Sequence, residues 1–207
     1  MNAAKTDERD SRRRLLDAAR DLIWRASYAG VSVDDLCKAA EVNKGTFYHF
    51  FKSKAELATA SFEDFWEQVK RPLYDRLFSP QVPALKRLEQ YVQMAVDGQT
   101  AMHKECGQVL GCPYTAVGSE VATQDESLRL LSHEMFARTI RYLESAVRDA
   151  QRDGTIAEGD AAVLAADLHA FLIGVLLQAK IANSLAPLQG LSGRALRLLG
   201  VHSTTTT

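Results

Sequence analysis

Apolar residues recur at helical spacing along most of the chain, and short polar or glycine-containing stretches separate the periodic segments. The first segment predicts an amphipathic helix that ends near Gly30, with apolar positions Leu15, Ala18, Ala19, Leu22, Ile23 and Ala26. Ser32 and Asp35 are then spaced as a capping box, which opens a helix of barely two turns. Residues 41–43 form a bend, and Asn43 is a good cap for a second short helix. Two short helices joined by a three-residue turn make a helix-turn-helix unit.

The second short helix has two faces of different chemistry. One face is aromatic and predicts an apolar anchor at Phe47, Phe50 and Phe51. The other face is cationic and hydrogen-bonding, with no acid within it, and consists of Lys44, Gly45, Tyr48, His49 and Lys52. Such a face is suited to a DNA groove, although the pattern also fits a solvated surface helix.

The rest of the chain predicts further helices. A capping box at Ser53 opens a helix that ends or kinks near Pro72, and residues 79–83 form a loop. Periodicity resumes at 85–95 and weakens between 98 and 125. A strong helix follows over Glu126–Arg152, and Asp160 caps a last long helix from Ala161 to about Asn183. The chain is therefore predicted to be all-α.

The helix-turn-helix stretch carries a family resemblance. Gly30-Val31-Ser32-Val33-Asp34-Asp35-Leu36, then Gly45-Thr46-Phe47-Tyr48 with Phe50-Phe51 and Lys52-Ser53-Lys54-Ala55-Glu56-Leu57, resembles the DNA-binding domain of the tetracycline-repressor (TetR) family over residues 12 to about 58. The resemblance implies an N-terminal three-helix helix-turn-helix domain over 11–58 and a larger C-terminal helical ligand-binding and dimerisation domain over 59–201. It also implies a homodimeric, ligand-responsive transcription factor, usually a repressor.

The resemblance gives the last two long helices a role. In the TetR family the corresponding helices of two subunits pair across a two-fold axis, so Glu126–Arg152 and Ala161–Asn183 are expected to form the dimer interface. The second of these is apolar almost all round, but four polar residues make it too polar for an undefended membrane span. The alternative is that it is simply a central core helix.

The predicted DNA contacts divide by residue type. Lysine, threonine and tyrosine side chains reach phosphates or base edges, and a glycine allows close backbone approach. The arginine cluster 12–14 is expected to follow the backbone or enter the minor groove from a flexible arm. By resemblance, Ser32 is also a phosphate contact. The complete predicted set is Arg12, Arg13, Arg14, Ser32, Lys44, Gly45, Thr46, Tyr48, His49, Lys52 and Lys54.

Apolar and aromatic residues after Leu57 predict a site for a neutral or weakly charged, largely apolar inducer. The predicted residues, which fit ordinary core packing equally, are Phe62, Phe65, Trp66, Met102, Cys106, Cys112, Tyr114, His133, Met135 and Phe136. Three interpretations of Cys106 and Cys112 stay open: inert packing, ligand lining, and reaction with electrophiles or oxidants. The stretch 111–114 with 120–122 resembles the regulatory domain of one TetR subgroup, some of whose members sense electrophiles.

Composition narrows the function. The net charge is −1, but residues 1–54 hold 11 basic and 8 acidic residues, whereas the remainder holds 14 and 18. Three cysteines without a signal segment fit a reducing cytoplasm. The cysteines and histidines match no paired metal-ligand spacing, and no catalytic motif is present, so no enzyme, metal or cofactor is predicted. The expected partners are an operator in double-stranded DNA, a small-molecule inducer and a second copy of the chain, with no membrane. An enzyme and a purely architectural DNA binder are the alternatives.

Overall fold

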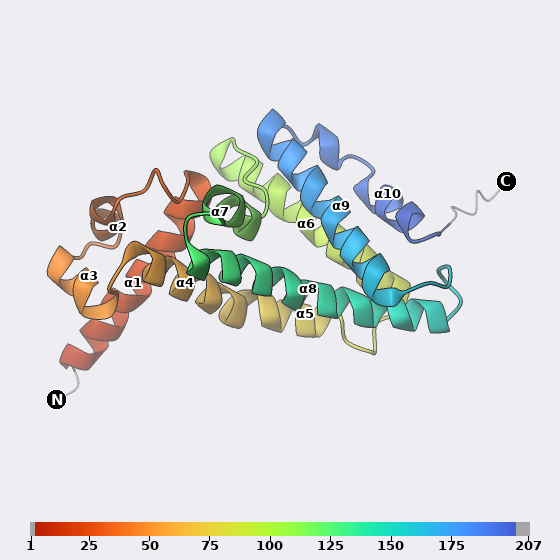
Figure 1. Ribbon diagram of the computed structural model, residues 1–207, viewed down its shortest axis with the longest axis horizontal. Coiled ribbons are helices and arrows are strands. Elements are labelled where there is room, and N and C mark those ends of the chain that lie inside the picture. Colours follow the sequence, from red (N-terminus) through yellow and green to blue (C-terminus); the bar gives the residue numbers. More distant parts are fainter. Residues whose placement is uncertain (1–2, 202–207) are drawn as a thin grey trace. The chain divides into compact units, whose positions relative to one another are not determined.

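The computed structural model describes residues 3–201, which are helical with no strand among them (Figure 1). The prediction of an all-α chain is confirmed. The N-terminal part contains a long helix α1 followed by three shorter ones, of which α2 and α3 form the predicted helix-turn-helix unit. Their bounds are Ala3–Arg25 for α1, Val33–Ala39 for α2, Lys44–Phe50 for α3 and Lys54–Phe65 for α4.

Side-chain caps set where these short helices begin. The hydroxyl of Ser32 accepts from the amide of Asp35, whose carboxylate accepts from the amide of Ser32, so the predicted capping box of α2 is confirmed. Asn43 accepts from the amide of Thr46 at 2.8 Å and caps α3 as predicted. These caps satisfy amides that have no partner within the helix, which matters most for helices of only two turns.

The helix that opens at Ser53 passes Pro72 rather than ending there. After α4 comes a π-helical turn, η1, over Trp66–Lys70, and α5 then runs over Arg71–Leu77. The amide of Arg71 bonds the carbonyl of Trp66, five residues back. A proline lacks the amide that continues an α-helix, and a wider turn is one way for a helix to adjust to this defect. The expected irregularity is therefore present, but as a π turn.

The remaining helices follow the predicted order. The weakly periodic stretch contains the end of a long helix α6 and a short helix α7, while the two strongest predictions, α8 and α9, have the expected bounds to within one residue. The elements are α6 over Ala84–Cys106, α7 over Pro113–Val121, α8 over Glu126–Arg152, α9 over Ala161–Ala182, the 3-10 turn η2 over Ala186–Leu188 and α10 over Leu191–Leu198.

The described chain divides into two compact units that differ from the predicted domains. Residues up to Arg71 group with Pro113–Met135, and Pro72–Cys112 groups with the residues from Phe136 onward. Residues 113–135 belong to the same unit as the N-terminal helices because α7 contacts α1, and the two ribbons lie next to each other in Figure 1. Each unit has its own buried apolar side chains, for example Leu15, Ile23, Leu36, Phe47, Leu57 and Phe62 in the first and Leu88, Leu143, Leu168 and Leu191 in the second.

One ion pair in the second unit is largely removed from water. The Arg87 side chain on α6 is 5% exposed and donates to Asp149 on α8 at 2.6 Å, and also to the carbonyls of Pro80 and Val82. The hydrogen bond from Arg87 lowers the pKa of Asp149. The guanidinium thus links the loop before α6 to α8. Its buried positive charge is balanced by the carboxylate of Asp149.

We predict that Asp149→Asn lowers the free energy of unfolding by about 3 kcal/mol at pH 7, because it leaves the buried Arg87 charge without its counter-ion. Since the folded-state pKa of Asp149 is lowered, its contribution is complete above the ordinary carboxylate pKa and is lost as the pH falls through the lowered value. The difference between variant and wild type should shrink below about pH 4. Urea titrations at several pH values measure this, with Glu144→Gln, which breaks only the pair with the exposed Arg148, as control. An equal effect of both variants would contradict the prediction.

Candidate DNA-binding surface and effector residues

Helix α3 is fixed by its aromatic face. Phe47 is fully buried and Phe51 nearly so, whereas Phe50 is only half-buried, so two of the three predicted anchors lie in the core. The rings of Phe47 and Phe51 lie 6.3 Å apart, and the guanidinium of Arg12 sits 5.6 Å from the Phe51 ring centre. This packing settles which side of a seven-residue helix faces outward.

The outward side of α3 carries the predicted reading residues. Lys44, Gly45, Tyr48 and His49 are exposed, and Tyr48 keeps 56% of its surface in solvent while its ring edge packs on Phe47 at 5.1 Å. Lys52, just beyond the helix, is exposed as well. Thr46 is half-buried, and its hydroxyl donates to the Asn43 cap. The exposed side chains on this side are therefore a lysine, a tyrosine and a histidine, which suit phosphate and base-edge contacts.

An acid from the neighbouring helix approaches this face. Lys44 forms an ion pair with Asp34 on α2 at 2.8 Å, and this hydrogen bond raises the pKa of Lys44. Sequence spacing within α3 gave no sign of the pair, since Asp34 belongs to another helix. Both side chains are mostly exposed, so the pair is weak and a phosphate can compete for the lysine.

Two predicted phosphate contacts are already engaged inside the protein. The hydroxyl of Ser32 donates to Asp35 at 2.6 Å while accepting from its amide. The ammonium of Lys54 donates to the carbonyls of Tyr28 and Val31, each at 2.8 Å. Burial lowers the pKa of Lys54. The capping role of Ser32 was predicted, whereas the bonds from Lys54 to the backbone before α2 were not.

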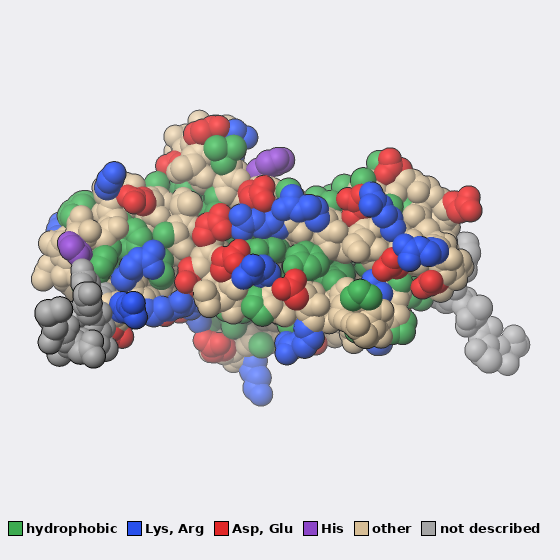
Figure 2. All heavy atoms as spheres, turned by 90° about the horizontal axis from the view of Figure 1, so that it is seen from below, with side chains coloured by type: hydrophobic (Ala, Val, Ile, Leu, Met, Phe, Trp, Pro, Cys, Tyr) green, Lys and Arg blue, Asp and Glu red, His purple; other side chains and the backbone are tan. Residues whose placement is uncertain are grey.

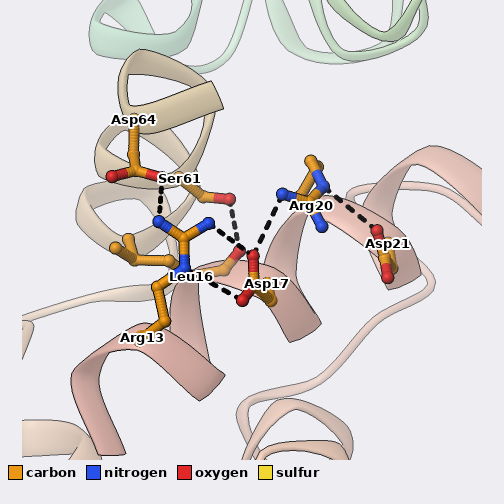
Figure 3. Close-up of polar contacts among 7 residues, drawn as sticks. All are labelled: Arg13, Leu16, Asp17, Arg20, Asp21, Ser61 and Asp64. Atoms are coloured by element: carbon orange, nitrogen blue, oxygen red, sulfur yellow. Dashed lines mark hydrogen bonds and ion pairs between the residues drawn. The ribbon is translucent and has the colours of Figure 1, made fainter. Parts of the chain in front are cut away.

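The arginine cluster lies on helix α1, so the expectation of a flexible arm is wrong. Figure 3 shows Arg13 donating to Asp17 at 2.7 Å and to Asp64 of α4 at 2.6 Å. In the same view, Arg20 also bonds Asp17, and Ser61 donates to the carbonyl of Leu16. The hydrogen bond from Arg13 lowers the pKa of Asp17.

The three arginines therefore differ in what they are free to do. Arg14 donates to the carbonyl of Ala40 at 2.9 Å and pairs with Asp10, so it braces α1 against the end of α2. Arg13 braces α1 against α4. Arg12 is exposed beside Phe51 and keeps the position of a DNA contact. The difference arises from tertiary contacts, because an acid of α4 bonds the guanidinium of Arg13 and a carbonyl at the end of α2 bonds that of Arg14.

The net charge of the whole chain gives no indication of DNA binding. Figure 2 shows basic and acidic side chains interspersed over the visible surface, without one extended basic field. Net charge is −1 for the chain. The case for DNA binding therefore depends on the local arrangement at α3 and Arg12.

The predicted effector residues of the first unit are mostly packed in its core. Phe62, Trp66, Tyr114 and Met135 are buried, and the rings of Phe62 and Tyr114 lie 5.7 Å apart. His133 is exposed. Phe65 is half-buried with Arg20 and Lys70 about its ring, at 5.5 and 5.9 Å from the centre, which is the setting of a surface cation–π contact.

The remaining predicted effector residues belong to the second unit. Met102, Cys106, Cys112 and Phe136 are all half-buried. The ring of Phe136 lies 5.0 Å from that of His169 on α9, a residue that sequence reasoning did not select. Burial lowers the pKa of His169 to about 4, so its imidazole is neutral at physiological pH. Its place within an apolar helix gave no signal that it meets an aromatic partner.

The segment that holds the two cysteines is tied down by two amide side chains. Gln99 accepts from the amide of Gly111 at 2.8 Å and donates to its carbonyl at 3.2 Å. Asn183 accepts from the amide of Val109 and donates to the carbonyl of Gly107. The thiol of Cys106 donates to the carbonyl of Met102 at 3.1 Å. Residues 107–111 are therefore a structured segment that follows α6.

A groove of about 410 Å³ runs along α8, but it is not the predicted apolar site. All of its lining residues come from this one helix, and most are charged: Arg141, Glu144, Ser145, Arg148, Asp149 and Arg152. Within residues 3–201 no three His, Cys, Asp or Glu side chains are grouped as metal ligands. Apolar inducers require a different kind of lining.

Two family models match the chain. Residues 15–60 match the bacterial regulatory proteins of the tetR family, and residues 84–192 match the tetracyclin repressor-like C-terminal domain. The chain belongs to the TetR family. It is a DNA-binding transcriptional regulator whose helix-turn-helix is formed by α2 and α3.

Relatives and solved structures agree with this assignment. The transcriptional repressor NemR of Escherichia coli is 29% identical over 89% of this chain and 92% of its own. The regulator AcuR of Cereibacter sphaeroides is 29% identical over 93% and 85%. The crystal structure of reduced E. coli NemR superposes with a TM-score of 0.78 at 25% identity, over 93% of this chain and 99% of NemR. A CifR cysteine mutant complexed with 26-bp operator DNA has the same fold, with a TM-score of 0.74 at 24% identity, over 88% of this chain and 94% of CifR.

We predict that Lys44→Ala and Tyr48→Phe each weaken operator binding by about 1–3 kcal/mol without changing the melting temperature. Lys44 is exposed, and Tyr48→Phe removes only the hydroxyl and keeps the ring that packs on Phe47, so the packing of α3 stays intact. Titration of a fluorescent duplex at fixed salt measures the affinity. Phe47→Ala is the contrasting variant, since it removes a buried ring and should unfold the helix-turn-helix. Unchanged operator affinity in both surface variants would show that this side of α3 does not contact the operator.

Proposed function

We propose that the protein is a homodimeric repressor that binds a pseudo-palindromic operator and is released by a small, largely apolar molecule. The observation that carries the proposal is helix α3, whose Phe47 side is buried while Lys44, Tyr48 and His49 project together into solvent. A helix anchored in this way presents a fixed set of donors to a groove. Membership of the TetR family supports the same role.

Helix α9 supports the homodimer. Its inner side is buried, whereas Val163, Leu177 and Ile181 keep 54%, 41% and 78% of their surface exposed. These residues share one stripe with Ala166 and Ala170, because they recur at helical spacing. Contrary to the expectation from its four polar residues, α9 is by length and composition apolar enough to cross a membrane, but core helices of soluble proteins pass the same test. The resemblance to the TetR family implies that the same stripe of a second copy packs against this exposed apolar stripe. Two-fold symmetry allows such a contact, because it pairs a surface with itself.

We predict that Ile181→Glu, alone or with Leu177→Glu, converts the dimer to a monomer, because it places charge in an apolar contact. Sedimentation velocity at micromolar concentration measures this. Gln178→Glu is the matched control, since it adds the same charge to a polar exposed position of the same helix. A wild-type monomer at that concentration would sink the dimer proposal, as would equal dissociation of the control.

The effector is proposed to bind reversibly. Release requires that it prefer the conformation that does not bind DNA, and a preference of about 100-fold corresponds to roughly 2.7 kcal/mol per site. Reaction at Cys106 or Cys112 is the competing trigger. We favour the reversible mode because Cys106 is half-buried and its thiol donates to the carbonyl of Met102, so its sulfur is not freely presented to solvent.

The cysteine variants separate the two triggers. In a Cys106→Ser/Cys112→Ser double variant, we predict that release from DNA by apolar ligands persists, because serine is close to cysteine in size and the change removes only the nucleophilic sulfur. Operator-release titrations with a panel of reversible apolar compounds and with oxidants measure this, alongside Cys37→Ser as control. Loss of all induction in the double variant, with induction kept in the control, would overturn the reversible model.

The proposed activity also sets where the protein works. A regulator that reads double-stranded DNA is expected in the cytoplasm, where bacterial operators lie, and needs no catalytic turnover. The relatives are named as transcriptional regulators, which supports a non-enzymatic role.

A further inference from the structure

The backbone between α1 and α2 is held from two sides by opposite charges. Glu120 of α7 accepts from the amide of Tyr28 at 2.9 Å and from the amide of Ala29 at 2.6 Å. On the carbonyl side, the ammonium of Lys54 donates to Tyr28 and Val31 at 2.8 Å each. Four charge-assisted hydrogen bonds therefore grip a four-residue turn, and such bonds are stronger than those between neutral groups.

The turn has little else to hold it. Ala29 and Gly30 are exposed, and the amide of Gly30 is capped only by the Ser27 hydroxyl. The Tyr28 ring is half-buried and lies 4.2 Å from the Lys54 ammonium. Val31 is the first buried side chain of this stretch. The geometry of the turn is thus set by its backbone partners more than by packing.

Helix α7 is itself firmly placed within the first unit. The ring of Tyr114 packs on Phe62 of α4 at 5.7 Å. A Cβ at Gly118 would lie 2.9 Å from Ser132 of α8, so these two helices approach as closely as a glycine allows. Glu120, one residue before the end of α7, therefore reaches the turn from a fixed base.

The turn leads directly to the reading helix. Ser32, which caps α2, follows Val31, and α2 is joined to α3 by the bend at 40–43. A shift of residues 28–31 would carry the start of α2 with it and alter where Lys44 and Tyr48 stand. We propose that Glu120 is a positioning residue for operator recognition, which it supports without touching DNA. This inference rests on the proposed operator binding.

The sign of the effect distinguishes positioning from simple electrostatics. Removing an acid makes the protein more positive, which by itself strengthens DNA binding. A positioning role predicts the reverse for Glu120. The charge control is Glu126→Gln, which removes an exposed acid in the same unit that pairs only with Arg129 on its own helix.

The experiment first selects a preferred duplex for the wild-type protein from a random library. Affinities of Glu120→Ala, Glu120→Gln and Glu126→Gln for that duplex and for a scrambled duplex are then measured at fixed salt. We expect Glu120→Ala to lose roughly tenfold in affinity for the selected duplex, with scrambled-duplex affinity unchanged or higher. Glu120→Gln, which keeps one acceptor, should lose less. Glu126→Gln should not weaken either affinity.

A second measurement guards against a merely unfolded variant. Amide hydrogen exchange should accelerate at Tyr28 and Ala29 in Glu120→Ala, while the amides of α8 and the melting temperature stay as in the wild type. If both Glu120 variants bind the selected duplex as tightly as the wild type, or more tightly as charge alone predicts, the positioning role is overturned. If the wild type itself selects no duplex, it is the proposed function that fails.

Discussion

The burial of Phe47 is the constraint on which the DNA-binding surface depends. Helix α3 has only seven residues, and helices shorter than about 12 residues are marginal in water. Its existence and its orientation therefore come from packing, in which Phe47 and Phe51 enter the core of the first unit. Once that side is fixed, helical geometry places Lys44, Tyr48 and His49 together on the exposed side. The side of α3 proposed to contact DNA is therefore the side that is left exposed when the aromatic side packs in the core.

Charged side chains around this core divide into those that hold the backbone and those left for DNA. Arg13 and Lys54 are held by acids or carbonyls of other elements, and Arg14 is held in the same way. The physical reason is that turns and helix ends expose backbone groups that need partners, and long basic side chains can reach them. Arg12 and Lys44 remain on the outside, the latter beside Asp34.

The effector part shows why apolar residues are hard to assign to a ligand. Phe62, Trp66 and Met135 were predicted as lining and are buried, but burial serves packing and ligand contact alike. Phe65, by contrast, lies under two cations at the surface. Polar contacts are more informative, as in the Gln99 amide that fixes Gly111 beside the cysteines.

Local patterns in the sequence determined the helices, their caps and the aromatic side of α3, because periodicity and capping depend on residues only a few positions apart. They placed α8 and α9 to within a residue and Asn43 at its cap. Only the tertiary structure decided that Arg13 bonds Asp64 of α4 and that Asp34 pairs with Lys44. It also decided that α7 belongs to the same unit as α1 and that Glu120 bonds the turn at Tyr28. Each of these joins residues on different elements, 92 positions apart in the last case, and the energy of such a contact depends on a separation in space that no local pattern encodes.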